Sequence, residues 1–221
     1  AASDVYKRQG HVVWSSPAVA DGMLFIGSSD NSTYAFGNIV RVPEDYKTIE
    51  EAIDAADPGA TVIIAPGIYH ESIVINKTLT IVGGMGSAPI FSGGGSGIAI
   101  TLLPDASGST IAGIVITHWD QGIVIVNSTG CKIYDNIMSL MNYNGIVLEG
   151  TNAANNLIYS NIFQDNAIAI NLTASSTSNT IYKNIISLSN IGLNLETNGN
   201  IIYANTIAEN EVGITMSNSY D

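Results

Sequence analysis

The motif Ile133-Tyr134-Asp135-Asn136 recurs three times, as Ile158-Tyr159-Ser160-Asn161, Ile181-Tyr182-Lys183-Asn184 and Ile202-Tyr203-Ala204-Asn205. Successive copies lie about 25, 23 and 21 residues apart, a spacing typical of solenoid repeats. A second short phrase follows each copy, at residues 145–148, 167–170, 192–195 and 213–216. In Leu193-Asn194-Leu195 the apolar residues alternate, which is the period of a β-strand with one buried face. This stretch therefore predicts repeats built from short strands.

A unit of two or three short strands cannot bury its apolar face alone, but copies stacked on one another form a continuous interior. The sequence therefore predicts an all-β fold, a parallel β-helix in which each repeat is one coil. We expect one interior column to hold Ile133, Ile158, Ile181 and Ile202, and a second to hold Ile146, Ile168, Leu193 and Ile214.

An asparagine ends every copy of the motif, at positions 136, 161, 184 and 205. These residues fall where a coil must turn sharply, and Asn tolerates the left-handed backbone conformation. Stacked amides can also hydrogen-bond from coil to coil. We interpret the four residues as a structural asparagine ladder, and ligand binding by their amides is the alternative.

Composition and charge limit the function classes. The chain has 221 residues, a formal net charge of −12 and only 12% charged residues. The acidic balance argues against a nucleic-acid partner, which requires a basic surface. No apolar run approaches the roughly 18 residues of a membrane-spanning helix, and Cys131 is alone, so no internal disulfide is possible. We expect no membrane span and no cofactor.

The first nine residues do not read as native protein. Asp4-Val5-Tyr6-Lys7-Arg8-Gln9 resembles the translation of a transposon end used to prepare sequencing libraries, so residues 1–9 are excluded from fold reasoning. On this interpretation the chain is a fragment, truncated at its start and also at its C-terminal end. The lack of a targeting signal then carries no information.

Residues 10–38 form a separate predicted unit. Asp21-Gly22 and Asp30-Asn31 are turn dipeptides between short apolar segments, which predicts a β-meander. Together with Trp14 and Tyr34-Ala35-Phe36, this pattern resembles one blade of the quinoprotein-type (PQQ-like) β-propeller. A single blade cannot close a propeller, so the quinone-binding role of that family does not carry over.

The predicted β-helix, residues 39–221, opens with one short α-helix. Thr48 and Glu51 are spaced as a capping box, Ile49 and Ile53 lie on one helical stripe, and Asp57-Pro58-Gly59 ends the helix. We expect this helix to plug the end of the β-helix, where apolar interior and strand edges would otherwise meet water.

This opening, continued by Ala65-Pro66-Gly67-Ile68-Tyr69 and Leu79-Thr80-Ile81-Val82-Gly83, resembles the start of right-handed parallel β-helix proteins of the pectin-lyase-like superfamily. The later Ile-Tyr-X-Asn coils are similar to repeats of NosD-type, periplasmic copper-binding proteins. The resemblance implies the fold but not an activity, because the same solenoid hosts lyases, hydrolases, epimerases, adhesins and surface-layer proteins.

We find no catalytic constellation. Polysaccharide lyases of the superfamily use calcium-binding carboxylates and a basic residue, usually Arg, yet no arginine follows Arg41. Glycoside hydrolases need carboxylates that flank one bond, whereas Asp105, Asp120, Asp135 and Asp165 are spread singly. The sequence therefore predicts no catalytic residues.

Two smaller patterns are candidate sites. His118 and Asp120 could share one face of a strand, beside Trp119, which could stack on a sugar; a polar turn between two strands is the favoured interpretation. Copper binding requires clustered His, Cys or Met. The scattered candidates are His70, His118, Cys131, Met138 and Met141, and we expect no metal site.

The best-defined candidate surface is a column of tyrosines. Because the preceding isoleucine points inward, Tyr134, Tyr159, Tyr182 and Tyr203 are expected to point outward and to stack at about 4.8 Å per coil. Such a strip could hold the sugar rings of a glycan chain, and with Trp119 it makes up the candidate carbohydrate-binding residues. The alternative is that the neighbouring rings only stabilise the sheet surface.

The sequence thus favours a non-catalytic β-helix module, secreted, at the cell surface or periplasmic, that acts as a rigid stalk or adhesion element and contacts a polysaccharide or cell-surface glycan. One alternative is a polysaccharide-modifying enzyme whose active site lies in coils outside this fragment. Another is a periplasmic copper-delivery protein of the NosD type.

Overall fold

The computed structural model describes residues 18–20, 23–27, 33–36, 38–173 and 175–217. Residues 1–9, Trp14 and the two predicted turns of the meander lie outside the described residues. The chain forms two compact units, residues 1–39 and 40–221.

The first unit is a three-stranded antiparallel sheet. Strands β1 (Ala18–Ala20), β2 (Met23–Gly27) and β3 (Thr33–Phe36) follow one another in the order β1-β2-β3. The predicted meander is confirmed, while its relationship to a propeller blade stays a prediction.

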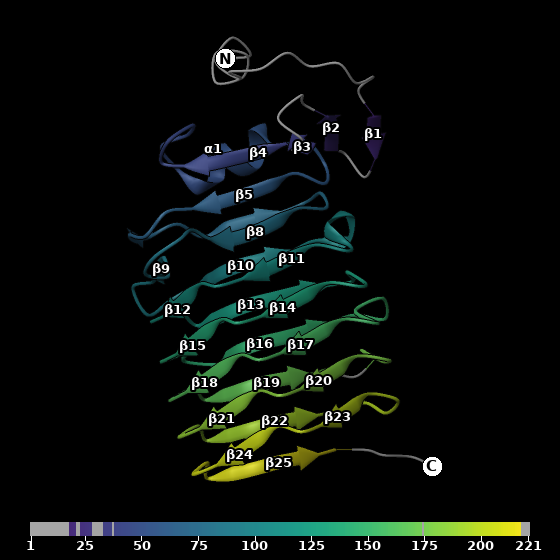
Figure 1. The fold of residues 1–221 in the computed structure, drawn as a ribbon. Coiled ribbons are helices and arrows are strands. Elements are labelled where there is room, and N and C mark those ends of the chain that lie inside the picture. Colours follow the sequence, from purple (N-terminus) through teal and green to yellow (C-terminus); the bar gives the residue numbers. More distant parts are fainter. Residues whose placement is uncertain (1–17, 21–22, 28–32, 37, 174, 218–221) are drawn as a thin grey trace. The chain divides into compact units, whose positions relative to one another are not determined.

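The second unit is a parallel β-solenoid, in which each full coil contributes one short strand to each of three sheets (Figure 1). Sheet I contains β4 (Ile39–Val42), β5 (Thr61–Ile64), β8 (Thr80–Gly83), β11 (Thr110–Ala112), β14 (Lys132–Tyr134), β17 (Leu157–Tyr159), β20 (Thr180–Tyr182) and β23 (Ile201–Tyr203). Sheet II contains β6 (Ile68–Tyr69), β9 (Ile90–Ser92), β12 (Val115–Thr117), β15 (Ile137–Ser139), β18 (Ile162–Gln164), β21 (Ile185–Ser187) and β24 (Thr206–Ala208). Sheet III contains β7 (Ile73–Ile75), β10 (Ile98–Leu102), β13 (Gln121–Val126), β16 (Asn144–Glu149), β19 (Ile168–Leu172), β22 (Ile191–Leu195) and β25 (Val212–Met216). A short 3-10 helix, η2 (Pro104–Ala106), connects β10 of sheet III to β11 of sheet I. The predicted all-β solenoid is confirmed.

The first predicted interior column is confirmed. Ile133, Ile158 and Ile181 are fully buried and pair in register along sheet I, and Ile202 extends the column as a partly buried residue. Sheets I to III enclose one continuous apolar core.

The second predicted column is wrong at one residue. Ile170, not Ile168, lies between Ile146 and Leu193 in sheet III, whereas Ile168 pairs with Asn144. A slip of two residues leaves every side chain on the same face of the strand, because the side-chain period is two. The alternating pattern of Ala167–Ile170 therefore could not distinguish the two registers.

Helix α1 (Ile49–Ala55) lies beside β4 at one end of the stack, as Figure 1 shows. Its predicted capping box is present: the Glu51 amide donates to Thr48 Oγ1 at 3.2 Å and the Thr48 amide to Glu51 Oε2 at 3.4 Å. A third group, Glu71 Oε2, accepts from the amides of Ile49 and Glu50 at 2.8 and 3.1 Å. Among the described residues, no helix is both long and apolar enough to cross a membrane.

The predicted asparagine ladder is confirmed. The side-chain amide of Asn136 donates to Asn161 Oδ1 at 3.1 Å, that of Asn161 to Asn184 Oδ1 at 3.1 Å, and that of Asn184 to Asn205 Oδ1 at 2.9 Å. A second ladder, which the motif did not indicate, joins Asn156, Asn179 and Asn200 at 3.0 and 3.1 Å.

The asparagines of the first ladder do not themselves adopt the left-handed conformation, so that expectation was wrong. The positive φ falls on the residue before each of them, with values of 54 to 56° at Asp135, Ser160, Lys183 and Ala204. This residue makes the corner between sheets I and II, and the asparagine that follows is thereby turned inward. Its amide is then free to bond along the solenoid.

Candidate functional site

The tyrosine column is built by sheet I. Each tyrosine is the last residue of its strand, and parallel pairing places the four side chains in register. Ring centroids of successive coils lie 4.9, 4.9 and 5.1 Å apart, with interplanar angles of 12, 13 and 3°. Tyr203 is 50% exposed, and Tyr134, Tyr159 and Tyr182 are half-buried. The predicted stacked geometry is confirmed, and its carbohydrate-binding role stays a prediction.

Stacking decides which parts of the rings a ligand can reach. The faces of Tyr159 and Tyr182 are covered on both sides by neighbouring rings, so the column offers ring edges and hydroxyl groups. Burial raises the pKa of the Tyr159 phenol above its usual value, and the neighbouring phenols of Tyr134 and Tyr182 raise it further. The Tyr159 hydroxyl therefore stays protonated at neutral pH and can both donate and accept hydrogen bonds.

The structure places Trp119 in the core. It is 6% exposed, and its Nε1–H donates to the Phe91 carbonyl at 3.2 Å. Its ring also lies so close to Gly93 that a side chain there would clash with it. A covered ring offers no face to a sugar, so Trp119 does not present the stacking surface that the sequence suggested.

His118 and Asp120 lie in the polar turn between β12 and β13, which was the favoured interpretation. His118 has a φ of 60°, and its Nδ1 lies 2.9 Å from Thr117 Oγ1. The Asp120 carboxylate accepts from the Gly97 amide at 2.9 Å and from the Asn142 side chain at 3.2 Å. The Asp120 bonds join this turn to the preceding and following coils, which gives Asp120 a structural role.

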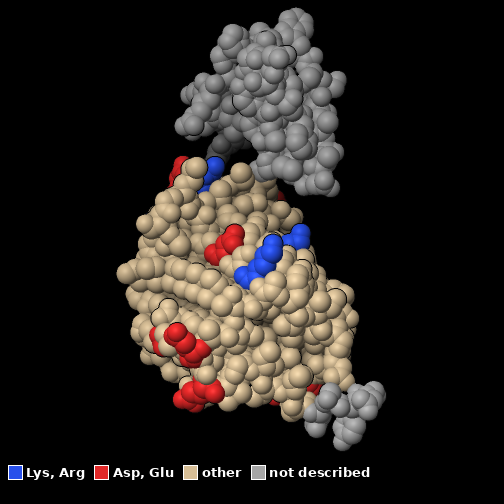
Figure 2. All heavy atoms as spheres, turned by 60° about the horizontal axis from the view of Figure 1, so that its bottom comes forward, with Lys and Arg blue, Asp and Glu red and all other residues tan. Residues whose placement is uncertain are grey.

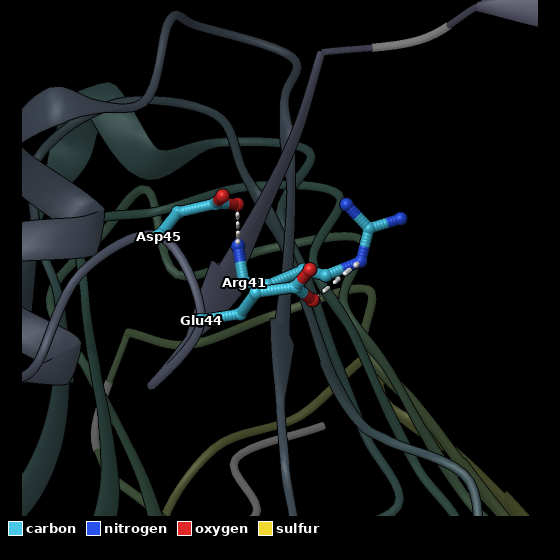
Figure 3. Close-up of polar contacts among 3 residues, drawn as sticks. All are labelled: Arg41, Glu44 and Asp45. Atoms are coloured by element: carbon cyan, nitrogen blue, oxygen red, sulfur yellow. Dashed lines mark hydrogen bonds and ion pairs between the residues drawn. The ribbon is translucent and has the colours of Figure 1, made fainter. Parts of the chain in front are cut away.

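The other charged candidates for catalysis are dispersed. Asp105 lies in η2, Asp135 lies between β14 and β15, and Asp165 directly follows β18. Arg41 lies in β4 at the capping end, where its Nε is 3.7 Å from Glu44 Oε2 and its backbone amide donates to Asp45 Oδ2 at 2.8 Å (Figure 3). The structure does not bring Arg41 near these carboxylates of the coils.

The potential copper ligands do not form a site. Met138 is fully buried and Met141 is 3% exposed, and both fill the apolar core. His70 Nδ1 lies 2.7 Å from the Ser92 carbonyl. Among the described residues, no three His, Cys, Asp or Glu side chains are grouped as metal ligands. The donor set therefore does not fit copper, which needs clustered His, Cys or Met.

Cys131 is a buried structural residue, and its chemistry can be tested. Burial raises the pKa of its thiol, and hydrogen bonds from the backbone of Ser109 and Gly108 offset only part of this effect. The reactive thiolate is therefore scarce at neutral pH. We expect iodoacetamide to label Cys131 in the native chain at least about a hundredfold more slowly than in the urea-unfolded chain. Mass spectrometry measures the labelling. Equal rates in the native and the unfolded chain would contradict the burial of Cys131.

Sequence reasoning missed the exposed face of sheet II. An isoleucine follows the asparagine of three motif copies, and Ile137, Ile162 and Ile185 are 39, 37 and 48% exposed. The signal was present as the repeated pair Asn-Ile directly after the corner.

Charged side chains are sparse on the solenoid. Figure 2 shows one face on which the few charged groups leave large uncharged areas. Binding to this surface would depend on apolar, aromatic and hydrogen-bonding groups more than on net charge.

Comparison with known proteins gives one family and one curated relative. The family model described as "Periplasmic copper-binding protein (NosD)" matches residues 58–221. A cell surface glycoprotein of Methanothermus fervidus is 38% identical over 95 residues, which are 41% of this chain and 15% of that protein. The chain thus spans only a small part of the length of this relative.

The solved structures that this chain matches include two enzymes. An alginate lyase from Paenibacillus sp. str. FPU-7 has a TM-score of 0.49 and 15% identity, and the match covers 76% of this chain and 75% of the lyase. The family 28 exopolygalacturonase of Yersinia enterocolitica has a TM-score of 0.34 and 13% identity, and the match covers 88% of this chain and 63% of that enzyme.

Proposed function

This chain belongs to the family of NosD, described as the periplasmic copper-binding protein, and from that premise we propose that it is a non-catalytic β-helix module that works outside the cytoplasm. Its proposed role is that of a rigid stalk or adhesion element that contacts a glycan. The periplasmic description of the family supports an extracellular, cell-surface or periplasmic location, as does the similarity to the cell surface glycoprotein of Methanothermus fervidus.

The stalk role follows from how the coils are joined. Adjacent coils are joined by backbone bonds in three sheets, and the coils that carry Asn136, Asn161, Asn184 and Asn205 are also joined by an amide ladder. Buried polar networks of this kind, when fully satisfied, rigidify the structure around them. A stack built in this way holds whatever it carries at a fixed distance from its base.

The tyrosine column is the observation that carries the glycan-binding part of the proposal. It aligns four hydroxyl groups and four aromatic edges along the solenoid axis. Aromatic side chains combine a large apolar contact area with a polar group, which explains their enrichment at binding surfaces. A glycan chain lying along the axis would meet one tyrosine for each coil it crosses.

A glycan array tests this role on the full chain. We expect the unsubstituted chain to bind at least one polysaccharide and the Tyr159→Ala/Tyr182→Ala variant to bind it at least about tenfold more weakly, because both central aromatic contacts are lost. The Tyr159→Phe/Tyr182→Phe variant keeps the rings and removes the hydroxyls, so it separates the two contributions.

The matched control is Tyr143→Ala. Tyr143 is 61% exposed and lies outside the column, so its loss is expected to leave glycan binding unchanged. Circular dichroism establishes that each variant is folded. Equal loss of binding in the Tyr143 variant, or no binding by the unsubstituted chain, would contradict the proposal.

No observation in the described residues favours the two alternative functions. The enzyme alternative needs catalytic residues from coils outside this sequence. The copper alternative needs clustered donors, which the described coils do not provide.

A further inference from the structure

Sheet II presents an outward face on which exposed isoleucines alternate with polar residues, and charged residues lie at its corners. In strands β15, β18 and β21 the middle residue points into the core, and the residues on either side point outward. The first outward residue is always the exposed isoleucine described above. The residue after each strand makes the next corner, and Leu140 and Leu188 there are 45 and 46% exposed.

Three successive coils of this face present similar outward residues, and the first and third coils are nearly identical. The coil of β15 presents Asp135, Ile137, Ser139 and Leu140; the coil of β18 presents Ser160, Ile162, Gln164 and Asp165; the coil of β21 presents Lys183, Ile185, Ser187 and Leu188. The two outer coils are identical at three of the four positions. At the fourth they carry opposite charges, Asp135 and Lys183.

A surface of this kind is complementary to itself. A two-fold axis that runs along β18, in the plane of the face, would place the coil of β15 against the coil of β21 of a second copy. Asp135 would then lie opposite Lys183 of the partner subunit, and Lys183 opposite Asp135 of the partner subunit. Contacts in which one surface patch meets its own copy are the usual basis of two-fold dimers.

The coils of β12 and β24, which flank these three coils, carry a further complementary pair of residues. His118 follows β12 and Glu209 follows β24, and both occupy the same corner with φ values of 60 and 59°. The same axis places His118 opposite Glu209 of the partner subunit. Among the described residues, Asp135 and Lys183 make no ion pair within their own chain, so both charges are available to a partner.

We propose that sheet II is a pairing surface through which two copies of this chain associate side by side, with their solenoid axes antiparallel. The five coils from β12 to β24 span about 19 Å at about 4.8 Å per coil, which makes a small interface. Interfaces of this size are weak, and we expect a dissociation constant between micromolar and millimolar. The tyrosine column belongs to sheet I, so this pairing uses a different sheet from the proposed glycan site.

Sedimentation equilibrium of the full chain tests the proposal. We expect a concentration-dependent dimer. Asp135→Lys and Lys183→Asp should each weaken it at least about tenfold, because each reversal converts both symmetric charge pairs to repulsion. The double variant Asp135→Lys/Lys183→Asp restores both pairs and should return the dissociation constant to within about threefold of the original.

Two further variants separate pairing from folding. Lys132→Asp makes the same charge change as Lys183→Asp, but at the exposed first residue of β14 in sheet I. It should leave the dimer unchanged. Asp165 lies on the proposed axis and would face its own copy, so Asp165→Asn should strengthen the dimer. A chain that stays monomeric up to about 1 mM, or a dimer unaffected by either single reversal, would overturn the proposal.

Discussion

Replacing Asn161 by alanine is expected to lower the free energy of unfolding by about 3 to 5 kcal/mol. Asn161 is fully buried in the first asparagine ladder. Its Nδ2 donates to the Ile133 carbonyl at 2.9 Å and to Asn184 Oδ1 at 3.1 Å, and its Oδ1 accepts from the backbone and side-chain amides of Asn136, both at 3.1 Å. The substitution removes all four bonds.

The cost is large because the partners remain behind in the core. The Asn136 backbone amide loses the acceptor that the ladder supplies, and water cannot reach it, since Asn136 is 1% exposed. A buried donor left without a partner costs about 1 to 3 kcal/mol. The cavity left by the amide adds to this cost.

Urea denaturation followed by far-ultraviolet circular dichroism measures the effect. Asn152→Ala is the matched control, because Asn152 lies exposed in the turn before β17, and its loss should change stability by less than about 0.5 kcal/mol. If the Asn161 and Asn152 variants were equally stable, the ladder would contribute nothing to stability.

Replacing Phe163 by alanine is expected to destabilise the solenoid by a similar amount, about 3 to 5 kcal/mol. Phe163 is the inward residue of β18, is fully buried and is among the largest side chains of the core. Its ring fills the space beside Gly145, whose position leaves no room for a Cβ against the ring and the Ala169 carbonyl. Alanine would leave a cavity in the middle of the stack, which neighbouring coils cannot close without breaking their register.

Phe163→Leu provides the graded control. Leucine keeps most of the apolar volume, so we expect it to cost less than about 1.5 kcal/mol. Thermal unfolding of both variants under one set of conditions gives the comparison. Equal losses for alanine and leucine would show that ring shape, rather than the filled volume, sets the stability at this position.

Much of the fold could be predicted because the repeated motif couples two separate constraints. Ile158 must point inward for the coil to bury anything, and Asn161 must directly follow the corner residue Ser160 for its amide to bond along the stack. These requirements fix the phase of sheet I. In sheet III the sequence offers only the alternation of apolar and polar residues. A shift of two residues leaves this alternation unchanged, so the predicted column contains Ile168 where the structure has Ile170.

The candidate site could be predicted only where the register of paired strands alone sets the position of a side chain. The stacking of Tyr159 on Tyr182 follows directly from parallel pairing of β17 with β20. Trp119 lies in a turn, where no strand period governs the side chain, and glycines near it provide space for its ring to fold inward. The outward direction of Ile162 depended on the conformation of the preceding corner, which composition does not reveal.

The direction of the hydrogen bonds determines how the module would respond to force. Bonds between coils run along the solenoid axis, so a pull on the last coil loads its bonds to one neighbour before any others. The strand would peel away coil by coil, each of 21 to 25 residues, and release about 70 to 90 Å of extended chain at each step. A surface structure built in this way would yield gradually under tension and absorb mechanical work, where a compact domain would rupture in a single event.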